Sequence, residues 1–387
     1  MGISGIERVM NRVLLCTSPL QVVNARSAMD YLGEREQYRD YIVMIHPSLL
    51  ENTKKQIKII GRDLGYDGVI DLSDLAKELF DKKQTYNLIE KLFKLKSLIK
   101  ENITNHKALE NKVSIILKNE IGDIDILFYR INYKYIDSIF IYSQKRAIRY
   151  GVEDGIGDYI PKYWPCSNLN FYEIKHSLIS TITSWTSFVC SLVFTRNYKE
   201  CRKVFLKPVC NFQQSFKNIE TADSICVKNS YLRNIAKLSI RSRESRNKKI
   251  IIIGSLIPDT RYQLDLAKEV QIYNSMIEII SKKHEVNRED IWYKHHPRLS
   301  YESWKYKKNN MKCTFYAYED VHLIDTEFEN DNVVGVYSVG STALLYAKVI
   351  YDISSYLIDI TNQSCHPSAY AKAKYIAKKF NIPICTV

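Results

Sequence analysis

The chain has 387 residues, of which 45% are hydrophobic, and its formal net charge is +13. This length allows about two or three domains of roughly 150 residues, and the hydrophobic content excludes a disordered chain or a small disulfide-held scaffold. The charge predicts attraction to an anionic partner, a class that includes nucleic acid, a membrane surface, a nucleotide donor and an acidic polysaccharide.

The cysteines and the amino terminus predict a reduced, cytoplasmic protein. Nine cysteines are spread from Cys16 to Cys385 without a CxxC pair or a repeated spacing, which indicates neither a disulfide framework nor a zinc site. The first residues lack the order of basic, apolar and cleavable parts that a signal peptide has. A stretch at 176–194, uncharged after its histidine, is diluted by Ser and Thr, which favours a core or surface-docking helix over a membrane span.

Strand and helix patterns alternate along the first half of the chain. Such alternation implies a parallel sheet with helices on both faces. Residues 163–237 that follow are predicted to be helical and irregular. The predicted strands are 12–18, 41–46, 68–73, 123–130 and 146–153, and the predicted helices are 19–32, 51–64 and 74–100.

The alternation restarts after a basic stretch without apolar periodicity, residues 237–249. The predicted strands are 249–255, 290–298, 332–338 and 354–360, and the predicted helices are 264–283, 321–329, one opening within 339–348, and 369–380. We therefore predict an α/β protein of two doubly wound, Rossmann-like domains whose sheet edges face a cleft. The N-terminal domain covers 1–240, the linker 241–249 and the C-terminal domain 250–387, and the last helix is a candidate to pack back on the N-terminal domain.

An acidic pair ends the strand predicted at 146–153. Glu153 and Asp154 are followed directly by Gly155, within the stretch "YGVEDGIGDY". The carboxyl ends of strands are where ligands bind in open α/β sheets, so the pair is a candidate active-site element. A solvated turn is the alternative interpretation.

A candidate phosphate seat lies in the second half. Gly340, Ser341 and Thr342 follow a predicted strand and open a helix, where backbone amides and hydroxyls favour an anion. Ordinary helix capping would use the same residue types, and the lysine and spacing of a P-loop are absent.

A cationic cluster ends the strand before it. His295 and His296 stand beside a lysine and an arginine and could bind a phosphate or protonate a departing one. Adjacent side chains on a strand point to opposite faces, so only one histidine should enter the cleft, and Pro297 restrains His296. The His-Pro pair also begins at His46 and His366, so alone it is weakly specific.

Together "EDG", "HHP", "GST" after a strand and the opening "CTSPLQVVNA" resemble the bacterial GT-B sialyltransferases, in the lipooligosaccharide sialyltransferase and capsular polysialyltransferase families. The resemblance spans most of the chain in layout and rests on short motifs in identity. It implies inverting transfer of sialic acid from CMP-sialic acid to a hydroxyl of a bacterial surface glycan, either lipooligosaccharide or a polysialic acid capsule. No metal and no cofactor beyond the donor are expected.

The resemblance also implies a role for each motif residue. Glu153 would be the base that takes the proton of the acceptor hydroxyl, although Glu departs from the commoner aspartate there. His296 would contact the phosphate of CMP and help it leave. The residues expected to bind substrate are Asp154, Gly155, Gly254, Ser255, Pro297, Glu319, Asp320, Ser338, Gly340, Ser341 and Thr342.

Basic helices near 82–100 and 196–207 favour an anionic glycan acceptor, with a galactose-terminated glycan as the other candidate. The same charge could bring a cytoplasmic enzyme to the inner membrane as a peripheral protein. Transfer of another CMP-activated keto sugar such as Kdo is an alternative within the enzyme class. A nucleic-acid-binding protein is the alternative outside it, suggested by the charge and 28 Tyr, but no RNP, KH or helix-turn-helix pattern appears and we expect no nucleic-acid partner.

Overall fold

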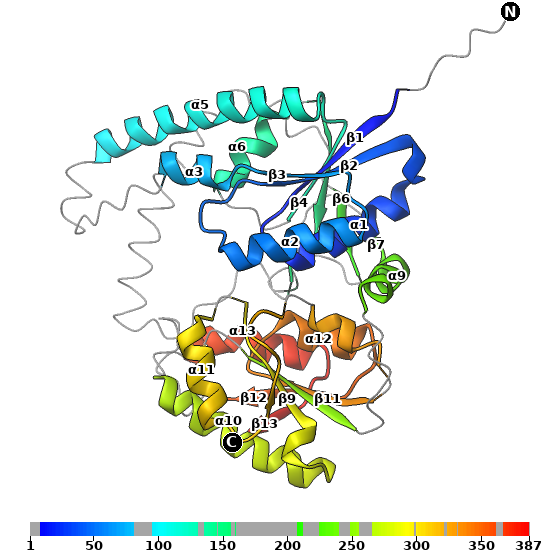
Figure 1. Cartoon of the computed structure of the whole chain (residues 1–387), viewed down its shortest axis with the longest axis vertical. Helices are drawn as coiled ribbons and strands as arrows, with labels where there is room; N and C mark the ends of the chain where they lie inside the picture. The colour runs from blue at the N-terminus through cyan, green and yellow to red at the C-terminus, as the bar shows by residue number, and fades with distance from the viewer. Residues whose placement is uncertain are drawn as a thin grey trace, which may run out of the picture. The chain divides into compact units, whose positions relative to one another are not determined.

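The computed structural model describes residues 8–80, 95–130, 135–144, 146–155, 159, 207–211, 224–239, 248–254, 265–297, 299–320, 323–330, 332–360 and 367–386. Contacts divide the chain into two compact units (Figure 1). Unit 1 consists of Met1–Asp154 and Cys166–Ser230, and unit 2 of Gly155–Pro165 and Tyr231–Val387. Each unit is therefore discontinuous in sequence.

Unit 1 is built on a seven-stranded sheet with the order β3-β2-β1-β4-β5-β6-β7. All neighbouring strands run parallel. The strands are β1 Met10–Leu15, β2 Tyr38–Met44, β3 Gly68–Asp71, β4 Ile126–Arg130, β5 Ile148–Val152, β6 Lys207–Cys210 and β7 Ile225–Cys226. The helices are α1 Pro19–Leu32, α2 Glu51–Asp63, α3 Ser73–Phe80, α5 Leu95–Glu120 and α6 Tyr135–Ser143, with a 3-10 turn at Arg35–Gln37.

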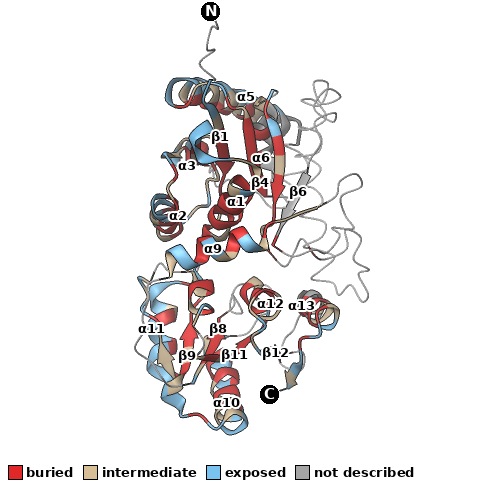
Figure 2. Ribbon diagram, turned by 90° about the vertical axis from the view of Figure 1, so that its right-hand side faces the viewer, coloured by how far each residue is buried: buried red, intermediate tan, exposed pale blue. Residues whose placement is uncertain are grey.

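Helices pack on both faces of this sheet, which explains why its central strands are nearly continuous apolar runs. Val13 and Leu15 of β1 belong to one buried cluster with Leu109 and Val113 of α5. The other face carries α2, whose Gly61 lies against the side chain of Ile42. Figure 2 shows the central strands as buried and the outer faces of the helices as exposed.

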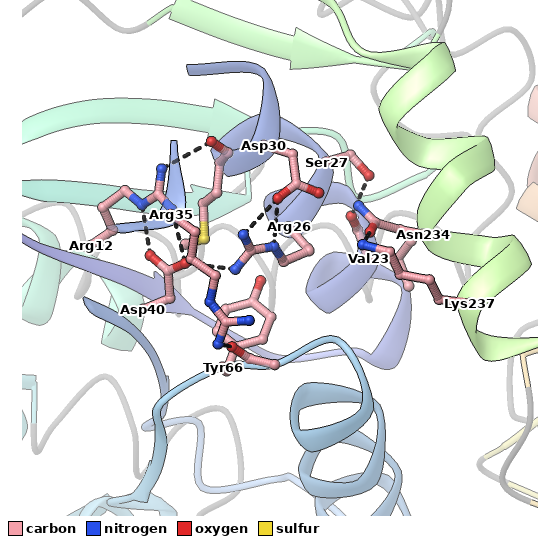
Figure 3. A network of polar contacts seen from close by, with 12 residues as sticks. Arg12, Val23, Arg26, Ser27, Asp30, Arg35, Asp40, Tyr66, Asn234 and Lys237 are labelled. Atoms are coloured by element: carbon pink, nitrogen blue, oxygen red, sulfur yellow. Dashed lines mark hydrogen bonds and ion pairs between the residues drawn. The ribbon is translucent and has the colours of Figure 1, made fainter. Parts of the chain in front are cut away.

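A network of buried charges joins β1, β2 and α1 (Figure 3). Arg12 and Asp40 have no exposed surface, and the guanidinium of Arg12 donates to both carboxylate oxygens of Asp40 at 2.6 and 2.8 Å. Arg26 donates to Asp40 at 2.6 Å and to Asp30 at 2.8 and 2.6 Å. One buried carboxylate therefore neutralises parts of two guanidinium groups.

Unit 2 is built on a six-stranded parallel sheet with the order β10-β9-β8-β11-β12-β13. The strands are β8 Lys249–Ile253, β9 Ile291–Lys294, β10 Thr314–Phe315, β11 Val333–Ser338, β12 Ser355–Asp359 and β13 Ile384–Thr386. The helices are α10 Leu266–His284, α11 Tyr301–Asn310, α12 Thr342–Val349, α13 Pro367–Lys379 and most of α9 Lys228–Leu238, with 3-10 turns at Arg288–Asp290 and Ile324–Glu327.

The predicted pair of doubly wound parallel sheets is confirmed. The helix predicted at 321–329 is wrong, because the described part of that stretch forms only a short 3-10 turn. The strand predicted to be last, 354–360, is followed by β13, so that prediction is also wrong. The uncharged stretch at 176–194 and most of the predicted linker lie outside the described residues. Within the described part of the chain, no helix combines the length and apolar character that a membrane span requires.

Candidate active site

The strand order of each sheet predicts where a ligand would bind. In open α/β sheets the ligand crevice lies beyond the carboxyl ends of the strands where the order reverses. This switch point falls between β1 and β4 in unit 1 and between β8 and β11 in unit 2. The residues that follow these strands and their neighbours are therefore the candidates for chemistry.

Glu153, directly after β5, is held by two residues of unit 1. Its side chain is fully buried, and one carboxylate oxygen accepts the backbone N–H of Asn211 at 3.0 Å. Its backbone carbonyl accepts the side-chain amide of Asn24 at 2.8 Å. Asn211 in turn donates its own amide to the side-chain oxygen of Asn24 at 2.8 Å. The three residues form a closed ring of hydrogen bonds.

Asp154 has different surroundings from its neighbour. Its side chain is 29% exposed and lies 4.0 Å from Arg130. It accepts hydrogen bonds from Gln21 and, at 3.4 Å, from the hydroxyl of Ser18. Burial raises the pKa of Asp154 above its ordinary value, against the opposing effects of Gln21 and Arg130. The two carboxylates of the pair are thus chemically distinct.

Several residues at this edge were missed by the sequence reasoning. Arg130 is the last residue of β4 and donates to Asp137 of α6, with its Nε at 3.0 Å. A charged residue ending an apolar strand was a usable signal for it. Gln21 and Asn24 lie one helical turn apart on α1, inside the stretch quoted for the resemblance.

In unit 2, Gly254 follows β8 and is packed too closely for any other residue. A Cβ there would lie 2.3 Å from the hydroxyl oxygen of Tyr293. That hydroxyl accepts a hydrogen bond from Lys307 at 3.0 Å, and Lys307 forms a fully buried ion pair with Glu269 at 2.5 Å. A buried polar network therefore supports the turn at Gly254, whereas Ser255 lies outside the described residues.

The two histidines after β9 differ in exposure. His295 is 4% exposed and stacks on Tyr318 with ring centroids 5.2 Å apart, whereas His296 is half-buried and Pro297 is exposed. Burial, with a smaller effect of the Lys294 charge, lowers the pKa of His295 to about 4. Of the two, His296 is the one with surface to offer a ligand.

The two acidic residues predicted near the nucleoside also differ. Asp320 accepts a hydrogen bond from the ammonium of Lys294 at 2.8 Å, and its backbone carbonyl accepts another at 3.2 Å. Burial lowers the pKa of Lys294, and the charge of Asp320 opposes this effect. Glu319 is exposed. Asp320 is therefore tied to the end of β9, and its neighbour is not buried.

The stability of unit 2 should respond to the proton on His295. Its pKa is about 4 in the folded protein, against an ordinary value of 6.5, so the unfolded chain takes up the proton first as pH falls. Folding stability from this group is therefore full above pH 6.5 and is lost as pH falls towards 4. We expect wild type to lose up to about 2 kcal/mol more stability than His295→Phe between pH 7 and pH 5.

Denaturant unfolding at the two pH values measures this difference. Phe preserves a ring against Tyr318 but binds no proton, so it isolates the titration from the packing. Equal losses in the two proteins would contradict the prediction.

The start of α12 combines capping with close packing. Ser341 caps the helix by accepting the N–H of Ala343 at 3.3 Å, so the capping interpretation holds for its hydroxyl. Ser338, at the end of β11, donates to the carbonyl of Ile253 at 3.0 Å and accepts the N–H of Gly340 at 3.2 Å. It therefore ties β11 to β8 where the strand order of unit 2 reverses.

Gly155 lies against the start of α12. Its φ is +140°, and a Cβ there would lie 2.4 Å from the hydroxyl oxygen of Thr342. Both residues belong to unit 2. The glycine of the acidic motif is thus required for contact with the candidate phosphate seat.

The strand order of unit 2 shows which candidate residues follow neighbouring strands. Because β9, β8 and β11 are neighbours, His296, Gly254 and Ser341 follow adjacent strand ends of one sheet. In the sheet of unit 1, Asp125 precedes β4 and so lies at the amino ends of the strands, away from the candidate residues. It accepts the N–H of Asn11 at 2.8 Å. Within the ranges that the structure describes, no group of three or more His, Cys, Asp or Glu side chains is arranged to hold a metal ion.

Comparisons with known proteins give one family and one fold. A model of the alpha-2,8-polysialyltransferase (POLYST) family matches residues 12–359. A search of curated proteins finds no match. Among solved structures the chain is similar to the calicheamicin glycosyltransferase, with 8% identity, a TM-score of 0.50 and coverage of 98% of this chain and 86% of that one.

Two further solved structures are similar at lower scores. The glycotransferase of kitacinnamycin shows 8% identity over 98% of this chain and 85% of that one, with a TM-score of 0.46. A UDP-N-acetylglucosamine 2-epimerase shows 12% identity over 95% and 82%, with a TM-score of 0.42. At such identities a likeness concerns the fold alone, and the first of the three confirms the predicted GT-B fold.

Proposed function

Because this chain belongs to the alpha-2,8-polysialyltransferase family and is a glycosyltransferase, we propose that it transfers sialic acid from CMP-sialic acid to a hydroxyl of a bacterial surface glycan. The observation that carries this proposal is the family match, which spans residues 12–359 and so includes every motif of both sheets.

The proposed chemistry needs one base and one cationic clamp. The anomeric carbon of the donor is tertiary and carries a carboxylate, so it readily forms an oxocarbenium-like species without a protein nucleophile. The acceptor hydroxyl attacks this carbon and loses its proton to Glu153, while the bond to CMP breaks and its electron pair remains on the phosphate oxygen. Because attack and departure occur on opposite faces, the configuration inverts.

Unit 2 supplies groups suited to the departing phosphate. His296 follows β9 and is half-buried. An anion bound before α12 would face the first backbone amides of that helix. Such preorganised donors stabilise the charge that develops as CMP leaves. Gly254 and Ser338 keep the intervening strand ends in place.

The acceptor that we propose is an anionic α2,8-linked oligosialic acid, with a galactose-terminated glycan as the alternative. The family description and the net charge of +13 support the anionic choice. The same charge would support peripheral binding to an anionic membrane, where lipid-linked glycans are assembled.

The test is CMP release from CMP-sialic acid in the presence of each acceptor, with and without EDTA. We expect release that depends on the oligosialic acid acceptor and is unaffected by EDTA. No release with any acceptor, together with no shift of the melting temperature by CMP, would overturn the proposal. Turnover with CMP-Kdo alone would replace the donor but retain the reaction class.

A further inference from the structure

The ring formed by Asn24, Glu153 and Asn211 joins three elements that are far apart in the sequence. Asn24 lies on α1, Glu153 follows β5 and Asn211 follows β6. All three are buried, with exposed fractions of 2%, 0% and 1%. Buried amides are placed at such positions only when they are hydrogen-bonded, so the ring fixes each of its members.

Two bonds of the ring restrain different parts of Glu153, and the third links the two residues that donate them. The backbone N–H of Asn211 holds one carboxylate oxygen at 3.0 Å. The amide of Asn24 holds the backbone carbonyl of the same glutamate at 2.8 Å. The bond between the two asparagine side chains, also 2.8 Å, keeps the donors in register with each other. Removing the Asn24 side chain breaks the bond to the carbonyl of Glu153 and the bond to Asn211. Removing the Asn211 side chain breaks only the bond to Asn24, so the backbone donor to the carboxylate loses its link to α1.

The neighbouring carboxylate is held by another set of residues. Asp154 contacts Gln21, Ser18 and Arg130, none of which belongs to the ring. The residues that hold Glu153 and those that hold Asp154 are connected only through the backbone of these two adjacent residues. The ring is therefore specific to the carboxylate that we propose as the base.

We propose that Asn24 and Asn211 are positioning residues that orient the carboxylate of Glu153 towards the acceptor hydroxyl. This role rests on the proposed function, because it requires Glu153 to be the base. It assigns the two asparagines to the chemical step and not to donor binding. A base displaced by about 1 Å loses up to about a hundredfold in rate, so the effect should appear in kcat.

The test is a double-mutant cycle of Asn24→Ala and Asn211→Ala. We expect each single variant to lower kcat by about 10–100-fold, while the donor KM and the CMP-induced shift in melting temperature stay within about twofold of wild type. Because the ring acts as a unit, the kcat of the double variant should lie within about threefold of the kcat of the less active single variant. A residue with a merely structural role would leave kcat per folded molecule unchanged.

Asn11→Ala is the matched control. Asn11 of β1 also joins separate segments through its side-chain amide, which donates to the carbonyls of Ile121 at 2.8 Å and Asp123 at 3.0 Å, between α5 and β4. These residues lie at the amino ends of the strands, away from Glu153. Asn11→Ala should lose stability without losing kcat. If Asn24→Ala does not fold, Asn211→Ala carries the test. It keeps both hydrogen bonds to Glu153 and so should cost less stability, but it removes the bond that links the two donors.

Two results would overturn the inference while leaving the proposed function intact. One is that the wild-type protein turns over and both single variants keep a kcat within about twofold of the wild-type value. The other is losses that multiply in the double variant, because independent residues behave in that way. A wild-type protein that releases no CMP would instead overturn the proposed function, and this role of the asparagines with it.

Discussion

Replacing Glu153 by Gln is expected to lower kcat by about 10²–10⁴-fold and to leave CMP affinity within about twofold of wild type. The amide oxygen of Gln can still accept the N–H of Asn211, so the hydrogen-bonded ring and the fold are retained. Only the basicity is removed, and the residues that we propose to bind the donor phosphate belong to unit 2. Acceptor-dependent CMP release measures the first quantity and thermal shift by CMP the second.

Asp154→Asn is the control for this substitution. Its amide oxygen can still accept from Gln21 and Ser18, so we expect a loss of less than about tenfold in kcat. An active Glu153→Gln variant together with an inactive Asp154→Asn variant would transfer the role of base to Asp154.

Replacing Asp40 by Asn should lower the free energy of unfolding by about 3–5 kcal/mol, because it leaves Arg12 and Arg26 as incompletely compensated buried cations. The carboxylate has no exposed surface, so water cannot take over its role. Denaturant unfolding with unchanged slope measures the loss.

Asp63→Asn provides the comparison for that variant. Asp63 pairs with Arg62 at 3.0 Å, but 43% of its side chain and 76% of that of Arg62 are exposed. Exposed ion pairs contribute about 0–1 kcal/mol, so the midpoint should barely move. Similar midpoints for the two variants would show that burial does not strengthen the Asp40 network.

The sequence predicted elements best where apolar pattern and end signals agree. α1 begins at Pro19 and ends at Leu32 as expected, because proline suits a first helical turn and a glycine follows the last residue. β8 and β11 were predictable for the same reason, as apolar runs that end in small residues.

The elements that were missed carry weak local signals. β6 contains Pro208 and β7 has two residues, so neither shows a strand period. α11 buries only Trp304 and Lys307, and its helical stripe is hidden among polar residues. Such elements are held by tertiary contacts that a local pattern does not contain.

The same difference applies to the candidate site. The position of Glu153 at a strand end followed from alternation alone. Its contact with Asn211 could not be predicted, because it depends on β6 pairing with β5. The packing of Gly155 on Thr342 also joins residues that are distant in the sequence.

The interleaved segments of the two units limit how this protein can be recombined with its relatives. Gly155 lies against Thr342, and Tyr159 packs edge-on against Phe380 with ring centroids 5.8 Å apart. A chimera with a single crossover near residue 231 would separate both pairs into different parents. An exchange that moves 155–165 together with 231–387 would keep them matched, so a swap of unit 2 requires two exchanged segments and not one.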